Sequence, residues 1–242
     1  MNEAPSTQPN EAPKKSSIPF GVRVGGIIGV LVIGGVILFG IVPSIVSQRK
    51  ESIQNLKDIG LAFHNYHDVY GKFPLAHFDD ETGTPRRSWR MALLPFLEEL
   101  ELYEKYDDNS MWNGDKNIGL SKETPSVFRS YFSDCSDGRT PFVAIVGEKT
   151  VFPDDRNVAF RDITDGASNT ILFIADYENP VKWSEPVDVT LDEFLERYAD
   201  RSDAVLHVVM ADGGLLELHE VSASTLKNLA ERNDGQVIPQ LQ

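Results

Sequence analysis

The chain has 242 residues, 41% of them hydrophobic, and carries a formal net charge of −14 at pH 7. This hydrophobic fraction is typical of a folded domain, and the acidic balance argues against a nucleic-acid partner and against adsorption onto an anionic lipid surface. The single cysteine, Cys135, excludes an intramolecular disulfide.

The N-terminal part of the chain predicts a tail followed by a membrane anchor. Residues 1–19 are rich in Pro, Ser, Asn and Gln, so we expect a disordered tail in the cytoplasm. Residues 24–48 carry no charged side chain, and a helix of this length crosses a bilayer. Residues 20–46 are therefore predicted to be a single transmembrane helix. A cleaved secretory signal is the alternative, but no A-x-A-like site follows the stretch.

The orientation of this helix is not decided by its basic flanks. The flanking cations are Lys14, Lys15 and Arg23 on one side and Arg49, Lys50 and Lys57 on the other. Because the two sets nearly balance, we rely on the size of the C-terminal part, since large domains are translocated regardless of charge. This predicts a single-pass protein of the cytoplasmic (inner) membrane, with its tail inside and its C-terminal domain extracytoplasmic.

A long amphipathic helix is predicted over residues 47–71. Apolar side chains recur there at helical spacing: Ile53, Leu56, Ile59, Phe63, Tyr66 and Tyr70. We expect this stripe to pack on the rest of the domain. Gly71 is expected to end the helix, and Pro74 prevents its resumption.

The remaining residues, 72–242, predict the globular part of an α+β domain with mainly antiparallel strands. Residues 75–87 are polar and are expected to be a loop, as are residues 107–126. Between them, residues 88–106 are helical in pattern, with a break at Pro95. The apolar stripe of that helix would be Trp89, Leu93, Leu97, Leu100 and Tyr103.

Short apolar runs predict strands at residues 142–146, 171–175 and 205–210. Turn and capping patterns then predict the elements around them. They are a hairpin through Asp212-Gly213 to residues 215–218, a turn at Asp165-Gly166, a helix from Thr190 (with Glu193 completing a capping box) to Tyr198, a helix over residues 223–232 and a final strand at 236–238.

Five segments of the chain carry a distinctive joint pattern. They are NLKDIGLAFHNYHD at residues 55–68, SWR at 88–90 with LPFLE at 94–98, PSVFR at 125–129, DITDGASNTI at 162–171 and ADG at 211–213. Together they resemble a bacterial pilin/pseudopilin-like family, the H-x9-DG family or domain of unknown function 1559. The resemblance implies that residues 47–242 form a pilin-like domain and that the protein acts at the cell envelope.

The chain departs from this family at its start and at three single positions. Family members with a pilin-type start carry Gly-Phe-Thr-Leu-Ile-Glu and are cut after the glycine. Here Gly21 retains the register, but Gly26 stands in place of the glutamate that pairs with a neighbouring subunit. Cleavage after Gly21 is therefore left open. The family's two cysteines are Ser52 and Ser130 here, and its histidine before the Asp-Gly is Ser202.

The best candidates for chemistry are His64, His67 and Asp68. On a helix the two histidines lie on adjacent turns of one face, so they could share a metal with His77 or Asp79 as third ligand. The alternative, which we favour, is that the imidazoles hydrogen-bond across the interface between the helix and the domain.

Other candidate sites are weaker still. Asp107, Asp108 and Asp115 suggest calcium, but Met111 and Trp112 stand where an EF-hand loop needs a ligand and a glycine, so a solvated acidic loop is expected. Ser168 lies in no nucleophile motif, and no phosphate loop or dinucleotide fingerprint is present. We therefore assign no catalytic, cofactor-binding or metal residue and do not expect an enzyme.

Three functions stay open. The one we predict is a non-enzymatic, membrane-anchored extracytoplasmic domain with a structural or interaction role, contacting envelope proteins or a second copy of itself. The second is a processed minor pseudopilin of a type II secretion or type IV pilus-like machine. The third is a module that binds an envelope polysaccharide or peptide, with Trp112 and Trp183 as stacking surfaces. The sequence does not identify a small-molecule ligand.

Overall fold

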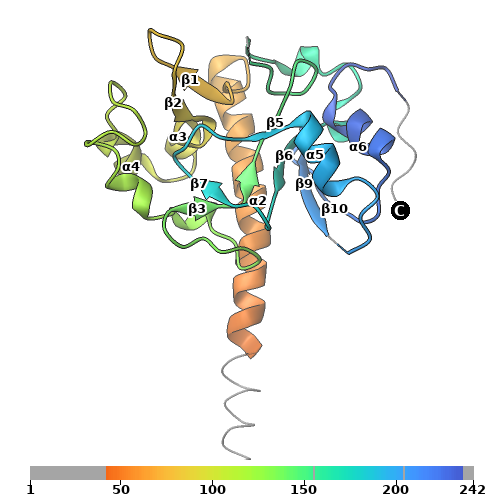
Figure 1. The fold of residues 1–242 in the computed structure, drawn as a ribbon, viewed down its shortest axis with the longest axis horizontal. Coiled ribbons are helices and arrows are strands. Elements are labelled where there is room, and N and C mark those ends of the chain that lie inside the picture. Colours follow the sequence, from red (N-terminus) through yellow and green to blue (C-terminus); the bar gives the residue numbers. More distant parts are fainter. Residues whose placement is uncertain (1–41, 155, 204, 237–242) are drawn as a thin grey trace, which may run out of the picture. The chain divides into compact units, whose positions relative to one another are not determined.

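The computed structural model describes most of the chain beyond the apolar stretch (Figure 1). The described residues are 42–154, 156–203 and 205–236. Contacts within the chain divide it into two units, Met1–Val46 and Ser47–Gln242, and the fold given below is that of the second unit.

The predicted tail and most of the predicted membrane span, residues 1–19 and 20–41, lie outside the described residues. Within the part that the structure describes, no helix is both long enough and apolar enough to cross a bilayer. The transmembrane interpretation of residues 20–46 therefore stays a prediction.

The long amphipathic helix is confirmed as α2, Val42–Tyr70. Its inward stripe is buried at Leu56, Ile59 and Phe63. The helix ends where predicted, because Gly71 adopts φ +71°, a left-handed conformation that suits glycine, and its N–H donates to the His67 carbonyl at 2.7 Å. The predicted burial is wrong for one residue of the stripe. Tyr70, the last helical residue, is 55% exposed, although its ring still contacts those of Tyr66 and Phe96.

A β-hairpin replaces the loop predicted for residues 75–87. Its antiparallel strands are β1 (His77–Asp79) and β2 (Pro85–Ser88). The turn is closed by the Asp80 carboxylate, which accepts hydrogen bonds from the N–H groups of Thr82 and Thr84 at 2.8 and 3.0 Å. The two strands pair with each other although their sequence is too polar to predict a strand.

The helix predicted over residues 88–106 is divided into three pieces: α3 (Trp89–Leu93), the 3₁₀ helix η2 (Leu94–Phe96) and α4 (Leu100–Lys105). The division follows the predicted break, because Pro95 lacks the N–H that would continue an α-helix. Glu98 then adopts φ +60° and redirects the chain before α4. Leu100, which the continuous stripe would bury, is exposed as a result.

An antiparallel sheet of four strands forms the centre of the domain, in the order β10-β9-β6-β4. The strands are β4 (Phe142–Val143), β6 (Ile171–Ala175), β9 (Leu206–Met210) and β10 (Leu215–Leu218). The predicted strands at β6 and β9 and the β9–β10 hairpin are confirmed. In Figure 1, α3 and α4 lie on one side of α2, and β9, β10, α5 and α6 lie on the other.

The strand predicted at residues 142–146 is interrupted. β4 ends at Val143, and β5 (Ile145–Val146) pairs in parallel with β8 (Val189–Thr190) outside the main sheet. The cause is a side chain from far along the sequence, since the Ala144 N–H donates to the Asp188 carboxylate at 2.8 Å. A further short pair joins β3 (Arg139–Thr140) to β7 (Val181–Lys182).

Two helices cover the second face of the sheet. α5 (Leu191–Tyr198) begins at the predicted capping box, in which the Thr190 hydroxyl accepts from the Glu193 N–H at 3.2 Å. α6 (Ala223–Ala230) ends two residues before its predicted limit. Gln236 is not in a strand, and the rest of the predicted final strand lies outside the described residues.

Four short 3₁₀ helices complete the described elements. They are η3 (Leu120–Lys122), η4 (Ser126–Phe128), η5 (Phe160–Asp162) and η6 (Ala167–Asn169). The last lies in the turn predicted at Asp165-Gly166, where Gly166 adopts φ +97°.

Both faces of the sheet are buried. One face packs on α2 around Phe63, whose ring centroid lies 5.0 Å from that of Trp89 and 5.8 Å from those of Phe152 and Phe173. The other face packs on Phe194 of α5 and on leucines of α6. Helix α2 therefore belongs to the core of the domain, and its packing fixes the position of the loops described next.

Candidate functional site

His67, the first sequence candidate, lies in the interface between α2 and the domain. Its Nε2 accepts a hydrogen bond from the Phe160 N–H at 3.3 Å, and its ring centroid lies 4.5 Å from that of Phe160. Burial lowers the pKa of His67, and the neighbouring Asp68 partly opposes this shift. This arrangement matches the prediction that an imidazole hydrogen-bonds across the interface between the helix and the domain.

The other candidate ligands do not join His67. His64 packs on the same Phe160 ring, with centroids 5.2 Å apart, whereas His77 pairs with Asp79 on β1 at 3.4 Å. In residues 42–154, 156–203 and 205–236, no three His, Cys, Asp or Glu side chains lie close enough together to hold a metal ion. The structure therefore gives no support to the shared metal.

The acidic loop after α4 is held by its own side chains. The Asp107 carboxylate is bound by Lys116 and by the Asn109 N–H at 2.9 Å, and the contact with Lys116 is the main cause that lowers the pKa of Asp107. The amide of Asn117, which is fully buried, donates to the carbonyls of Asp107, Ser110 and Met111. The Asp107 carboxylate therefore already has partners within the loop, whereas a calcium ion would need free carboxylates.

The stacking surface proposed for a polysaccharide is corrected at Trp183. This side chain is 0% exposed, and its ring stacks on Phe128 with centroids 6.2 Å apart. The backbone N–H of Trp183 donates to the Gly138 carbonyl at 2.8 Å and holds this residue, which follows β7, against the core. Trp183 cannot offer a face to a sugar. Trp112 stays partly exposed.

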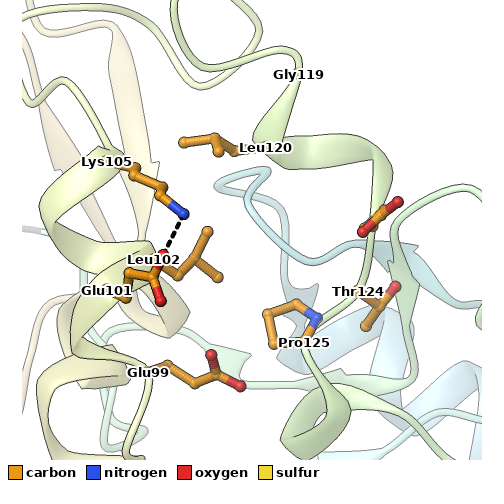
Figure 2. A pocket seen from close by; sticks show the side chains of 9 residues that line it. Glu99, Glu101, Leu102, Lys105, Gly119, Leu120, Thr124 and Pro125 are labelled. Carbon is orange, nitrogen blue, oxygen red and sulfur yellow. Dashed lines mark hydrogen bonds and ion pairs between the residues drawn. The ribbon is translucent and has the colours of Figure 1, made fainter.

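A cavity of about 360 Å³ lies beside α4. Figure 2 shows Glu99, Glu101, Leu102 and Lys105 on one side of it and Leu120, Thr124 and Pro125 on the other. The dashed line in Figure 2 joins Lys105 to Glu101, whose atoms lie 2.6 Å apart. Because this cation already neutralises one of the carboxylates, the α4 cavity is the weaker of the two candidate sites described here.

The stronger candidate is a cavity of about 300 Å³ where the first turns of α2 meet the loop after η4. We call it the stem pocket. It is lined by Gln48, Glu51, Ser52, Asn55, Arg129, Ser130, Tyr131 and Cys135. Ser52, Asn55 and Ser130 are buried, so the floor of the pocket is polar.

The polar floor joins the helix to the loop. The Asn55 amide donates to the carbonyls of Ser126 and Arg129, both at 2.9 Å. The Ser52 hydroxyl donates to the Gln48 carbonyl at 2.9 Å and accepts from the Tyr131 N–H at 2.7 Å. Three of these four bonds connect residues more than 70 positions apart, and together they hold the shape of the pocket without a ligand.

Charged and aromatic side chains line the pocket or contact the residues that line it. Arg129 uses its Nε to donate to the Thr124 carbonyl at 2.7 Å. The Arg49 guanidinium lies over the rings of Tyr131 and Phe132, 5.8 and 5.6 Å from their centroids. Burial raises the pKa of Cys135, so its thiol stays protonated at neutral pH and is a poor nucleophile. The pocket is therefore suited to binding rather than to covalent chemistry.

No motif in the sequence marked this pocket, because its walls come from distant segments. One signal was available. Ser52 and Ser130, the two positions at which the resembling family carries cysteines, both line the pocket. A bridge between the two family cysteines would require these positions to lie close together, so the resemblance offered a contact between α2 and the loop as an expectation.

The comparison with known families agrees with the sequence resemblance. Residues 48–143 match the model of a family described as "Protein of unknown function (DUF1559)". All residues of the stem pocket fall inside this range. No curated protein and no solved structure matches the chain. Residues 48–143 are therefore similar to the DUF1559 family.

Proposed function

We propose that this protein is a membrane-anchored, extracytoplasmic domain of pilin-like design that works through contacts at the cell envelope and not through catalysis. The observation that carries the proposal is the continuity of α2. The chain is already helical at Val42, inside the uncharged stretch of residues 24–48, and the same helix buries Leu56 and Phe63 in the domain core. An anchor over residues 20–46 would therefore be joined to the domain by one helix.

The surface of α2 supports an interaction role. Residues 46–51 are exposed, although they precede a stretch that is packed in the core. Val46 is among the large apolar side chains that are most exposed. An exposed helical stem beside a membrane anchor is open to contact with envelope proteins, with a second copy of the chain, or with lipid.

The prominent polar groups of the domain serve its structure, which supports a role outside catalysis. His67 hydrogen-bonds to the backbone across the α2 interface, and Asp107 ties an internal loop. The buried Arg90 and Asp188 pair with each other at 2.8 Å. None of these three arrangements sets a base beside a nucleophile, which acyl-transfer chemistry would need.

The test is to fractionate cells that express the full chain and to treat intact spheroplasts with protease. An anchored extracytoplasmic domain stays with the membrane pellet at alkaline pH and is digested from outside. Release by alkali would overturn the anchor, and protection from protease in spheroplasts that becomes digestion after lysis would overturn the orientation.

A further inference from the structure

We propose that the stem pocket binds the head group of a zwitterionic phospholipid, phosphatidylethanolamine, with its phosphate at Arg129 and its ammonium at Glu51. The inference deepens the proposed function and rests on it, since it takes the domain to be anchored in a bilayer.

The two charges that face the pocket are opposite and are not paired with each other. Glu51 and Arg129 both line the cavity, yet they form no ion pair within 4.0 Å, either together or with another described residue. Arg129 has only its Nε engaged, by the Thr124 carbonyl. A cavity that presents an unpaired guanidinium and an unpaired carboxylate is complementary to a ligand that carries both a phosphate and an ammonium group.

The polar floor favours a small polar group over an acyl chain. Ser52, Asn55 and Ser130 are buried beneath the opening, and the cavity holds about 300 Å³. Burying hydrocarbon against such a floor would gain little, whereas a polar head group can keep its charges at Arg129 and Glu51. The pocket is therefore expected to hold the head group and to leave the acyl chains in the bilayer.

The depth of the pocket along α2 fits the head-group layer. Gln48, Glu51 and Ser52 follow the predicted end of the span at residue 46 by two to six positions. Along α2, at about 1.5 Å per residue, this separation is about 3–9 Å of helix. Polar layers of about 5–8 Å on each side separate the hydrocarbon core from water.

The rim of the pocket has the composition found at membrane interfaces. Tyr131 is 42% exposed, and Arg49 lies over its ring. Tyrosine is enriched where a protein crosses the head-group layer, and arginine approaches lipid phosphates there. Glu51 and the net charge of −14 disfavour a purely anionic lipid such as phosphatidylglycerol.

The experiment is native mass spectrometry of the full chain in detergent micelles, with phosphatidylethanolamine and phosphatidylglycerol added at equal concentration. The wild type should retain phosphatidylethanolamine in preference. Arg129→Gln and Glu51→Gln should each lower its retention about tenfold, the loss expected for one hydrogen bond to a charged group. Matched changes of exposed residues outside the pocket, Arg161→Gln and Glu104→Gln, should leave retention unchanged.

A charge-reversal variant guards against a merely structural effect. Glu51→Lys places a second cation at the pocket, so it should shift the preference from phosphatidylethanolamine to phosphatidylglycerol. Because Glu51 is exposed, this variant is expected to fold. Equal retention of the two lipids by the wild type, or retention that none of the pocket variants changes, would overturn the proposal.

Two further measurements distinguish failure of the lipid site from failure of the proposed anchor. Water-soluble glycerophosphoethanolamine carries the same charges without acyl chains, and binding of this compound as tight as that of the lipid would overturn a lipid site. Alkaline extraction tests the anchor separately. Retention that depends on Arg129 and Glu51 supports the pocket even if the anchor fails, whereas an anchored chain with insensitive retention overturns the pocket alone.

Discussion

At the scale of single residues, the most consequential polar group in the core is the ion pair between Arg90 and Asp188. The Arg90 guanidinium is fully buried and also donates to the Phe142 carbonyl through Nε and Nη2, at 2.9 and 2.7 Å. Asp188 accepts from the indole N–H of Trp89 at 3.0 Å as well. One carboxylate, in the segment before β8, thus connects α3 with Ala144, the residue that follows β4.

The first prediction concerns Asp188→Ala. Removing the carboxylate leaves Arg90 charged and buried without its partner, so the free energy of unfolding should fall by about 3–5 kcal/mol. Urea unfolding of the detergent-solubilised chain measures the change, with Glu104→Ala as an exposed control. A loss within about 0.5 kcal/mol, the range of ordinary surface changes, would show that the pair does not hold these elements.

The second prediction is a loss of stability in mild acid that depends on His67. Burial lowers the pKa of folded His67 below its ordinary value of 6.5, so the unfolded chain binds more protons once the pH falls below that value. Stability should therefore decrease as the pH is lowered through 6.5 and level off below the folded pKa. His207, whose pKa burial also lowers, should add an effect of the same sign.

Unfolding free energies measured at about pH 7 and about pH 5 test this dependence, since unperturbed carboxyl groups titrate lower. His67→Gln should flatten the pH profile, whereas His219→Gln, which changes an exposed histidine, should not. An unchanged profile in His67→Gln would show that the contact with Phe160 is indifferent to protonation.

Burial of individual side chains was the hardest feature to predict from the sequence. Trp183 lies in a segment rich in turns and charges, and nothing nearby in the sequence shows that its ring stacks on Phe128, 55 positions earlier. The stem pocket was missed for the same reason, because Ser52 meets Tyr131 across 79 positions. Local patterns carry no information about such contacts.

At the scale of elements, the close approach of α2 to the sheet depends on Gly60. A Cβ atom at this position would lie 3.1 Å from the Cγ1 of Val209 on β9, which is tighter than normal van der Waals contact. The missing side chain thus lets the helix backbone approach the strand, at the cost of lower helix propensity.

The third prediction follows from this contact. Gly60→Leu should force α2 away from β9 and lower the free energy of unfolding by about 1–3 kcal/mol, as overpacked cores do. Leu61→Ala, on the exposed neighbour, is the control and should change stability by about 0.5 kcal/mol or less. Equal stability of Gly60→Leu and wild type would mean that the contact between α2 and β9 accommodates a larger side chain without strain.

Elements with local signals were predicted well. The capping box at Thr190 marks α5, the Asp212-Gly213 turn marks the β9–β10 hairpin, and Gly71 marks the end of α2. Elements formed by distant partners were not. The β1–β2 hairpin is polar and depends on the turn at Asp80, and the interruption between β4 and β5 is caused by Asp188, 44 positions beyond Ala144.

At the scale of the whole molecule, the chain has a described domain and an N-terminal part that is known from its sequence alone. The described domain is an α+β fold whose sheet is buried on both faces, and its segment 48–143 matches the DUF1559 family. The anchor rests on the uncharged stretch of residues 24–48, most of which precedes the described part. Helix α2 includes the last residues of that stretch, and its middle turns are buried in the core at Leu56 and Phe63. The proposed role of the protein therefore depends on whether residues 20–46 are retained as an anchor in the cell.

The most direct test is the intact mass of the native protein extracted from membranes. We predict the full chain of 27.0 kDa, with or without the initiator Met, because the anchor is expected to be retained. A chain that begins at Val22 would instead identify a processed pseudopilin and direct the search to secretion-machine partners. A start beyond residue 43 would reveal a cleaved signal peptide and would contradict the claim that the domain is held at the membrane by its own helix.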